Sequence, residues 1–347
     1  MQALLQPLRI VAIGGGTGLP VLLAGLDQAG TDLTAIVNVS DDGGSSGRLR
    51  QSFDMPAVGD LRNCLVAMSG GNSHLAEIFQ HRFSGGGDLE GHAVGNLILS
   101  ALYQKTGSLM QAIEIASLLL PARGRALAAT EIPATLCAAL DDGTVLRGES
   151  NITAGGRRIE RVWLEPDNLP ASPGVLESIH SADAIVLAPG SLYTSLLPNL
   201  LVAGVAGAIR SSSAVKVLVC NLMTQPGETD GFSASDHLRV VGDCLGRRTV
   251  EFCVVNSAPP QPDYRDFLAR GTEPVACDLA LIRSLGAVPV EADLLLWKGR
   301  QIRHNPVPLG QLVVEIVRIR ASQNIQIEQF PGAQEVVPEC LTTSASN

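Results

Sequence analysis

A glycine-rich turn near the N-terminus is the first feature of the sequence that could bind a ligand. An apolar run precedes this turn and a leucine-rich segment follows it; its residues are Gly14, Gly15, Gly16, Thr17 and Gly18. Glycines let the backbone approach a ligand closely, so that N–H groups and the start of a helix face a phosphate. The turn lacks the third glycine of a dinucleotide fingerprint and the lysine of a P-loop. Phosphate binding and a tight connection without a ligand therefore both remain open.

A second polar loop follows the next apolar run, at residues 33–39. It combines glycines, serines, an arginine and two adjacent carboxylates: Ser40, Asp41, Asp42, Gly43, Gly44, Ser45, Ser46, Gly47 and Arg48. Hydroxyl and guanidinium groups bind phosphate oxygens, and Mg²⁺ takes one or two carboxylates together with such oxygens. Two interpretations stay open. Asp41 or Asp42 caps the following helix, or Asp42 and Asp60 hold a metal ion.

Two more clusters lie further along the chain. In the first, Asp60 is predicted to be a helix N-cap, with Arg62 and Asn63 on the first turn. In the second, His92 and Asn96 precede an apolar helical run and share a helix face if that helix begins early. A packing role and a ligand-binding role are both open for His92.

The order of apolar runs predicts an α/β fold. Short β-branched runs alternate with longer helical ones, and the expected strands are residues 9–13, 33–39, 184–188, 215–221 and 250–256. Nearly continuous apolar strands are typical of a parallel sheet covered on both faces by crossover helices. Ligands bind at the carboxyl ends of such strands. We therefore expect Gly16, Asp42 and Asn221 to lie around one cavity.

Residues 131–165 have a different pattern. Asp142-Gly143 and Gly155-Gly156 predict two hairpin turns between alternating residues, and so a small β-rich insertion. It interrupts one discontinuous domain formed by residues 8–130 and 166–322. Residues 323–347 lose periodicity, and we expect them to form a flexible tail.

The composition limits the class of protein. Of 347 residues, 46% are hydrophobic and 17% charged, which excludes a largely disordered chain. The net charge is −9 and aromatic residues make up 3%, so a nucleic-acid partner is not expected. The sequence shows no basic leader and no apolar run of about 20 residues, which predicts a cytoplasmic protein without a membrane partner. The seven cysteines lack C-x-x-C spacing, so reduced thiols are expected.

Six segments together resemble the bacterial gluconeogenesis factors, the YvcK-like proteins of the CofD-like superfamily, which is named for 2-phospho-L-lactate transferase. They read IGGGTGL (13–19), VSDDGGSSGRLR (39–50), GDLRNCLVAMS (59–69), GHAVGNLIL (91–99), APGSLYTSLLPNLLV (188–202) and CNLMTQPGETDGF (220–232). The resemblance extends from about residue 9 to residue 320. It implies a Rossmann-like, doubly wound, mostly parallel sheet with an inserted subdomain, assembled as a homodimer.

The resemblance also implies a set of binding residues. The glycine turn and residues 41–48 would line the phosphate side, with Asp60, Arg62, Asn63, His92 and Asn96 nearby. The pocket would be completed by Gly190, Ser191, Tyr193, Thr194, Asn199, Asn221, Thr224, Gln225, Glu228 and Thr229.

Three functions follow as hypotheses. The first is a protein that binds a nucleotide sugar, a UDP-sugar-like diphosphate, and is linked to cell shape, cell-wall synthesis and carbon metabolism. The alternative is a phospholactyl-type transferase acting on a nucleotide-activated donor, in which Asp41, Asp42 or Asp60 holds Mg²⁺ and arginines stabilise the transferred group. Leu19 replaces a glycine typical of the transferase branch, and few aromatic residues are available to hold a deazaflavin. The third, an NAD-dependent oxidoreductase, fits only the strand–glycine–helix opening.

Overall fold

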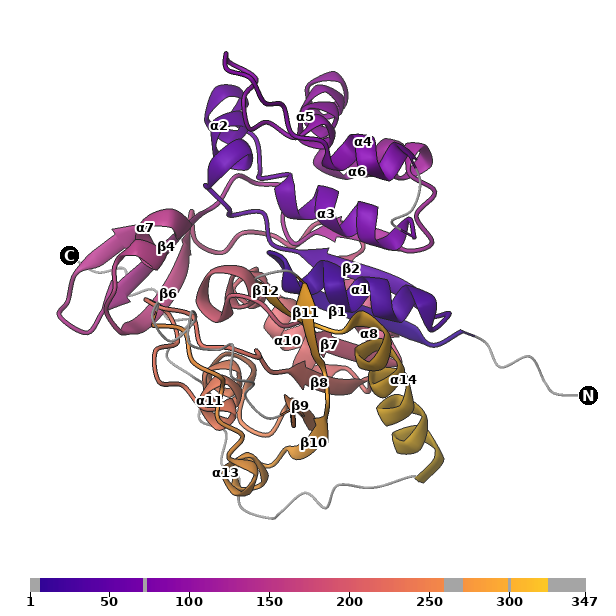
Figure 1. The fold of residues 1–347 in the computed structure, drawn as a ribbon, viewed down its shortest axis with the longest axis vertical. Helices are drawn as coiled ribbons and strands as arrows, with labels where there is room; N and C mark the ends of the chain where they lie inside the picture. The colour runs from indigo at the N-terminus through magenta and orange to yellow at the C-terminus, as the bar shows by residue number, and fades with distance from the viewer. Residues whose placement is uncertain (1–6, 71–73, 259–270, 299–300, 324–347) are drawn as a thin grey trace, which may run out of the picture.

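The centre of the molecule is a seven-stranded sheet in which all neighbouring strands are parallel (Figure 1). The computed structural model describes residues 7–70, 74–258, 271–298 and 301–323. In spatial order the strands are β10 (Val288–Ala292), β9 (Phe252–Asn256), β8 (Val215–Val219), β7 (Ala184–Leu187), β1 (Arg9–Gly14), β2 (Asp32–Val37) and β3 (Arg125–Ala128). The chain runs outward in one direction from β1 and in the other from β7. This doubly wound order confirms the predicted α/β fold class.

The sheet is buried on both faces, which explains why its strands are continuously apolar. In β1, Ile10 and Ala12 belong to one hydrophobic core, whereas Val11 and Ile13 belong to the other. Each core needs apolar residues at alternate positions of a strand, so both cores together require them at every position.

Helices cover each face of the sheet. The N-terminal half and the C-terminus supply α1 (Gly18–Gln28), α2 (Gly44–Phe53), α3 (Gly59–Met68), α4 (His74–Gln80), α5 (Val94–Thr106), α6 (Leu109–Leu119) and α14 (Pro306–Gln323). The other face carries α8 (Val175–Ser181), the π-helix η1 (Leu192–Leu196), α9 (Leu197–Leu200), α10 (Val205–Ser211), α11 (Ala234–Leu245) and α13 (Leu279–Ser284). A two-stranded antiparallel sheet joins β11 (Leu295–Lys298) to β12 (Gln301–His304). Among the described helices, none combines the length and apolar character needed to cross a membrane.

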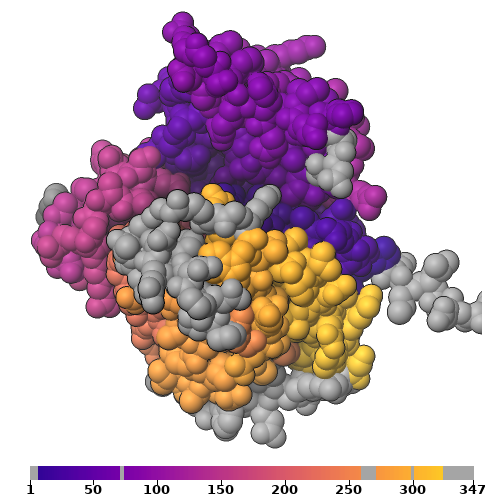
Figure 2. All heavy atoms as spheres, viewed as in Figure 1, coloured from indigo at the N-terminus to yellow at the C-terminus, as the bar shows by residue number. Residues whose placement is uncertain are grey.

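The small inserted subdomain packs on the hydrophobic core that contains Val11 and Ile13. It comprises β4 (Thr135–Leu140), β5 (Val145–Arg147), α7 (Glu149–Ala154) and β6 (Ile159–Glu165), with a three-stranded antiparallel sheet in the order β5-β4-β6. Figure 2 shows these residues as a magenta lobe on one flank of the molecule. Leu136, Ile152 and Leu164 of the insertion share a core with Leu187 of β7. The insertion therefore has no separate hydrophobic core.

One of the two predicted hairpin turns is wrong. Asp142-Gly143 lies in the turn between β4 and β5, as expected, but Gly155-Gly156 follows a helix, α7. The sequence pattern missed α7 because it is only six residues long and a group far away in the sequence holds its first turn. The predicted tail lies outside the described residues from residue 324 onward.

Helices α1 and α14 pack backbone to backbone through two glycines. A Cβ atom on Gly25 would lie 1.9 Å from the carbonyl oxygen of Pro306, and one on Gly310 would lie 2.2 Å from the carbonyl carbon of Gly25. Such distances are impossible for real atoms, so a side chain at either position would force the two helices apart. The glycines therefore set how closely α14 covers α1.

We predict that Gly25→Ala lowers the free energy of unfolding by about 1–3 kcal/mol, because the added methyl group overpacks the α1–α14 contact. Gly207→Ala in α10 is the matched control, since a Cβ atom there would have no neighbour within 4 Å. It should be neutral or stabilise the protein by up to about 1 kcal/mol through helix propensity. Urea unfolding measures both. Equal effects of the two substitutions would contradict the prediction.

Candidate functional site

A cavity of about 370 Å³ lies at the carboxyl ends of β1, β7 and β8. Its walls come from the glycine turn after β1 (residues 16–18), the loop after β7 (189–191) and the loop after β8 (221–225). Glu149 of α7 and Arg303 of β12 also line the cavity. The cavity lies where the strand order reverses between β1 and β7, which is the position at which open α/β sheets bind ligands.

The glycines of the first turn are required by the protein's own packing. A Cβ atom on Gly18 would lie 1.9 Å from the carbonyl oxygen of Pro189, and one on Gly14 would lie 3.1 Å from the Cβ of Ala188. Gly16 has a φ of 62°, which favours glycine. The turn after β1 and the loop after β7 therefore touch through their backbones, and this contact forms the floor of the cavity.

Asp60 reaches into the glycine turn instead of capping its own helix. The N–H of Gly16 donates a hydrogen bond to its Oδ2 at 2.5 Å, whereas α3 begins at Gly59 without a side-chain cap. Burial raises the pKa of Asp60 to about 6, with Asp41 adding repulsion and the Gly16 N–H opposing the shift. A carboxyl group of the protein thus already occupies the Gly16 N–H that was predicted to face a phosphate.

The two aspartates of the second loop have different partners, and neither caps α2. Asp41 accepts a hydrogen bond from the N–H of Gly43 at 2.8 Å. Asp42 accepts from the N–H and the hydroxyl of Ser150, at 3.0 and 2.8 Å, and so caps α7 of the insertion. Gly16 and Asn221 line one cavity, as expected. The prediction is wrong for Asp42, which is not among the described lining residues and instead contacts α7, whose first residue lines the cavity.

The carboxylates do not form a metal site by themselves. In the part of the chain that the structure describes, no group of three or more His, Cys, Asp or Glu side chains is arranged to hold an ion. Asp42 and Asp60 each use a carboxylate oxygen for a protein hydrogen bond. Mg²⁺ at these residues would need further ligands from water or from phosphate oxygens. The Mg²⁺ site stays a prediction.

Five of the predicted residues form a buried polar network between α2, α3 and α5. The hydroxyl of Ser45 contacts Nδ1 of His92 and accepts from the amide of Asn96, both at 3.0 Å. Arg62 donates to Asn96 at 2.9 Å and to Asn63 at 2.6 Å. Burial, with Arg82 adding repulsion, lowers the pKa of Arg62 to about 10. Among the described residues, none of these five lines the cavity, and the network instead joins three helices.

His92 and Arg48 lie where the sequence pattern did not place them. His92 precedes α5, which begins at Val94, so it shares no helix face with Asn96. Arg48 is exposed on α2 and donates to the carbonyl of Glu90 at 2.5 Å, away from the cavity lining. Ser46 is buried beside Gly59. These residues order the loops around the site.

The loops after β7 and β8 are tied together by reciprocal hydrogen bonds. The N–H of Gly190 donates to Oδ1 of Asn221 at 2.8 Å, and the amide of Asn221 donates to the Gly190 carbonyl at 2.7 Å. Glu228 accepts from Ser191 at 2.6 Å and from Gln225 at 2.9 Å. Its side chain is 3% exposed, and burial raises its pKa. The two loops are therefore joined into one wall of the cavity.

Four further predicted residues support this wall. The amide of Asn199 donates to the Gly14 carbonyl at 3.0 Å, and the hydroxyl of Thr229 accepts from the N–H of Gln225 at 2.9 Å. Thr224 accepts from the N–H of Glu273 at 2.9 Å. Tyr193 is 6% exposed and packs edge-on against Phe232, with ring centroids 6.5 Å apart. Tyr193 thus belongs to the core and is not among the described residues that line the cavity.

Sequence reasoning missed two charged residues that line the cavity. Glu149 begins α7, in a segment interpreted as a hairpin. Arg303 comes from β12, far from every recognised motif, and donates to Gln301 at 3.2 Å. His304 also lines the cavity, and burial lowers its pKa to about 4, so it is neutral. Arg303 is therefore the one lining residue in the described chain that carries a positive charge at neutral pH.

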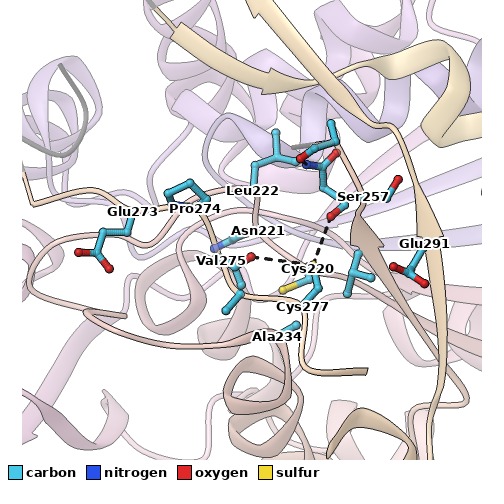
Figure 3. A pocket seen from close by; sticks show the side chains of 14 residues that line it. Cys220, Asn221, Leu222, Ala234, Ser257, Glu273, Pro274, Val275, Cys277 and Glu291 are labelled. Atoms are coloured by element: carbon cyan, nitrogen blue, oxygen red, sulfur yellow. Dashed lines mark hydrogen bonds between the residues drawn. The ribbon is translucent and has the colours of Figure 1, made fainter. Parts of the chain in front are cut away.

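A second cavity, of about 560 Å³, adjoins the first along residues 221 and 222 (Figure 3). It lies at the carboxyl ends of β8, β9 and β10. Glu273 and Glu291 lie at its opposite sides, and the thiol of Cys277 contacts the Asn256 carbonyl at 3.2 Å. None of its described lining residues is Lys or Arg. This cavity suits an uncharged group better than a phosphate.

Comparisons with known proteins identify the class. A family model described as 2-phospho-L-lactate transferase CofD matches residues 10–295. Two crystal structures of a Bacillus halodurans protein superpose with TM-scores of 0.86 and 0.85, at 42% and 43% identity. They cover 89% and 88% of this chain, and 100% and 99% of the solved chains.

Named relatives narrow the class further. The gluconeogenesis factor of Halalkalibacterium halodurans is 44% identical over 92% of this chain and 99% of its own length. That of Bacillus subtilis is 40% identical over 90% and 99%, and that of Listeria monocytogenes 46% over 85% and 91%. The chain therefore belongs to the CofD family and, within it, to the gluconeogenesis factors.

We predict that Asp42→Ala lowers the free energy of unfolding by about 0.5–2 kcal/mol, the usual cost of losing a helix cap. The amides of α7 should also exchange with solvent faster, because the first turn of α7 loses its partner. Asp42→Asn keeps an acceptor for Ser150 and should stay close to wild type. Urea unfolding and hydrogen exchange by mass spectrometry test this. An α7 that is equally protected in both variants would refute the capping role.

Proposed function

We propose that this protein binds a nucleotide sugar of the UDP-sugar type at the reversal point of its sheet. The observation that carries this proposal is the cavity between the glycine turn and the paired loops after β7 and β8. Such a position presents the start of α1 to an anionic ligand. Membership of a family described by a transferase of a phosphorylated substrate supports a phosphorylated ligand.

The two adjoining cavities suggest how the ligand is oriented. The diphosphate is proposed to lie in the first cavity, between residues 17–18, Ser191 and Arg303. Arg303 supplies a charged donor, which binds phosphate more strongly than a neutral one does. The uncharged part, sugar or base, is proposed to enter the second cavity past Asn221 and Leu222, because Glu273 and Glu291 would repel a phosphate there.

A Mg²⁺-dependent transferase is the second candidate. The observation that favours it is the group of carboxyl groups beside the cavity, since a cation would offset their charge when a phosphate binds. Turnover of a nucleotide-activated donor that requires Mg²⁺ would support this candidate. Binding without any product across donors and acceptors would favour the binding protein.

The cellular role is inferred from the resemblance to the gluconeogenesis factors. We propose a cytoplasmic homodimer that links carbon metabolism to cell-wall synthesis and cell shape. Light scattering of the purified protein tests the dimer. A monomer at micromolar concentration would refute it.

We predict that Arg303→Gln weakens UDP-glucose binding by about 10- to 100-fold, the loss of one hydrogen bond to a charged group. Arg318→Gln on the exposed face of α14 removes the same charge far from the cavity lining and should bind like wild type. Isothermal titration calorimetry gives the affinities. UMP and NADH serve as comparison ligands. Tighter binding of NADH than of UDP-glucose would reject the proposal in favour of an oxidoreductase.

A further inference from the structure

The first cavity has more carboxyl groups in and behind its wall than an anionic ligand should tolerate. Glu149 lines the cavity, and Asp41, Asp60 and Glu228 all lie close enough to repel its charge. Two unit charges 4 Å apart interact by about 4 kcal/mol near a protein surface. Arg303 alone offsets little of this. Unless a divalent cation offsets their charge, a diphosphate can bind here only if some of the carboxyl groups are neutral.

The geometry around Thr194 favours one extra proton. Its hydroxyl lies 3.2 Å from Oε1 of Glu149 and 3.4 Å from Oε1 of Glu228, and the residue is fully buried. A hydroxyl has one proton to donate and otherwise accepts. It can therefore donate to only one of these carboxyl groups. The second carboxyl group then has two possibilities. It carries a proton and donates it to Thr194, or its charged oxygen faces a lone pair of the Thr194 hydroxyl.

The distribution of donors shows which glutamate is the acid. Oε1 of Glu228 already accepts from Ser191 and Gln225, at 2.6 and 2.9 Å, and hydrogen bonds of this kind favour the ionised form. Glu149 has Thr194 as its one hydrogen-bond partner among the described residues. Thr153 also donates to Oε1 of Glu228, at 3.3 Å. The arrangement consistent with all five contacts is an acid O–H on Glu149 that donates to Thr194, while Thr194 donates to Glu228.

The electrostatics of the site agree with this assignment. Burial, together with the charges of Asp41, Asp60 and Glu228, raises the pKa of Glu149 to about 9, although the hydrogen bond with Thr194 opposes the shift. These groups come from the loop after β2, from α3 and from the loop after β8. Arg303 of β12 faces the same cavity with the opposite charge.

We propose that Glu149 takes part in ligand binding as a neutral acid, held by Thr194, and that its uncharged state admits the diphosphate of the ligand. This inference rests on the proposed function. It gives the inserted subdomain a role in the site, because α7 brings Glu149 to the cavity and Asp42 caps α7. The neutral form of Glu149 dominates below a pH of about 9. The affinity for the diphosphate ligand is therefore lost as the pH rises through that value.

Calorimetric titration with UDP-glucose from pH 7.5 to 10, in EDTA so that no divalent cation offsets the carboxylates, tests the proposal. The wild-type affinity should fall about tenfold over this range, since most Glu149 is ionised at the upper end. Glu149→Gln cannot ionise and should lose this fall. Glu160→Gln, an exposed residue of the same subdomain, removes one carboxylate elsewhere and should keep it.

The outcomes separate the two proposals. A wild type that binds no nucleotide sugar at pH 7.5 rejects the proposed function itself, and the role of Glu149 in binding with it. A wild type that binds but shows the same pH profile as Glu149→Gln rejects the role of Glu149 alone.

A measurement without ligand gives an independent readout. Carbon-13 NMR of the side-chain carboxyl groups, with Glu149→Gln providing the assignment, should show the Glu149 signal at its protonated position at pH 7. The signal should move only as the pH approaches 9. A Glu149 signal that titrates near its ordinary value of about 4.3 would overturn the inference, whatever the binding data show.

Discussion

The backbone contact between the turn after β1 and the loop after β7 is the constraint on which the site depends. Gly18 must lack a side chain because the Pro189 carbonyl occupies its place. The reciprocal hydrogen bonds between Gly190 and Asn221 extend this contact to the loop after β8. Three strand ends are thereby held as one rigid rim, and rigid walls lower the entropic cost of ordering a bound ligand.

The inserted subdomain completes the site because it is held from three directions. Asp42 caps its helix α7, Thr194 contacts Glu149, and Thr153 donates to Glu228 at 3.3 Å. These contacts bring carboxyl groups together in a protein whose net charge is already −9. Burial and mutual repulsion then favour protonated forms, so the site carries less negative charge than its number of carboxyl groups suggests.

Sequence patterns identified the residues of the site better than their individual roles. Loop composition at strand ends marked Gly16, Ser191 and Asn221, and all three line the cavity. Asp60 was assigned to the start of its own helix but hydrogen bonds to Gly16, forty-four residues earlier. Local rules such as helix capping consider only neighbours in the chain, so they fail for a side chain whose partner comes from another loop.

The resemblance to a known family added the doubly wound order of the strands. The sequence pattern by itself determined the strand–helix order, the parallel α/β class of the sheet and the edge at which polar loops gather. These depend on short-range hydrophobic periodicity and on the direction of parallel strands. Only the tertiary structure decided that Arg62 and His92 build a network between helices, and that Glu149 and Arg303 reach the cavity. Hydrogen-bond partners and desolvation depend on which distant segments contact each other in the folded protein, and the local sequence does not specify these contacts.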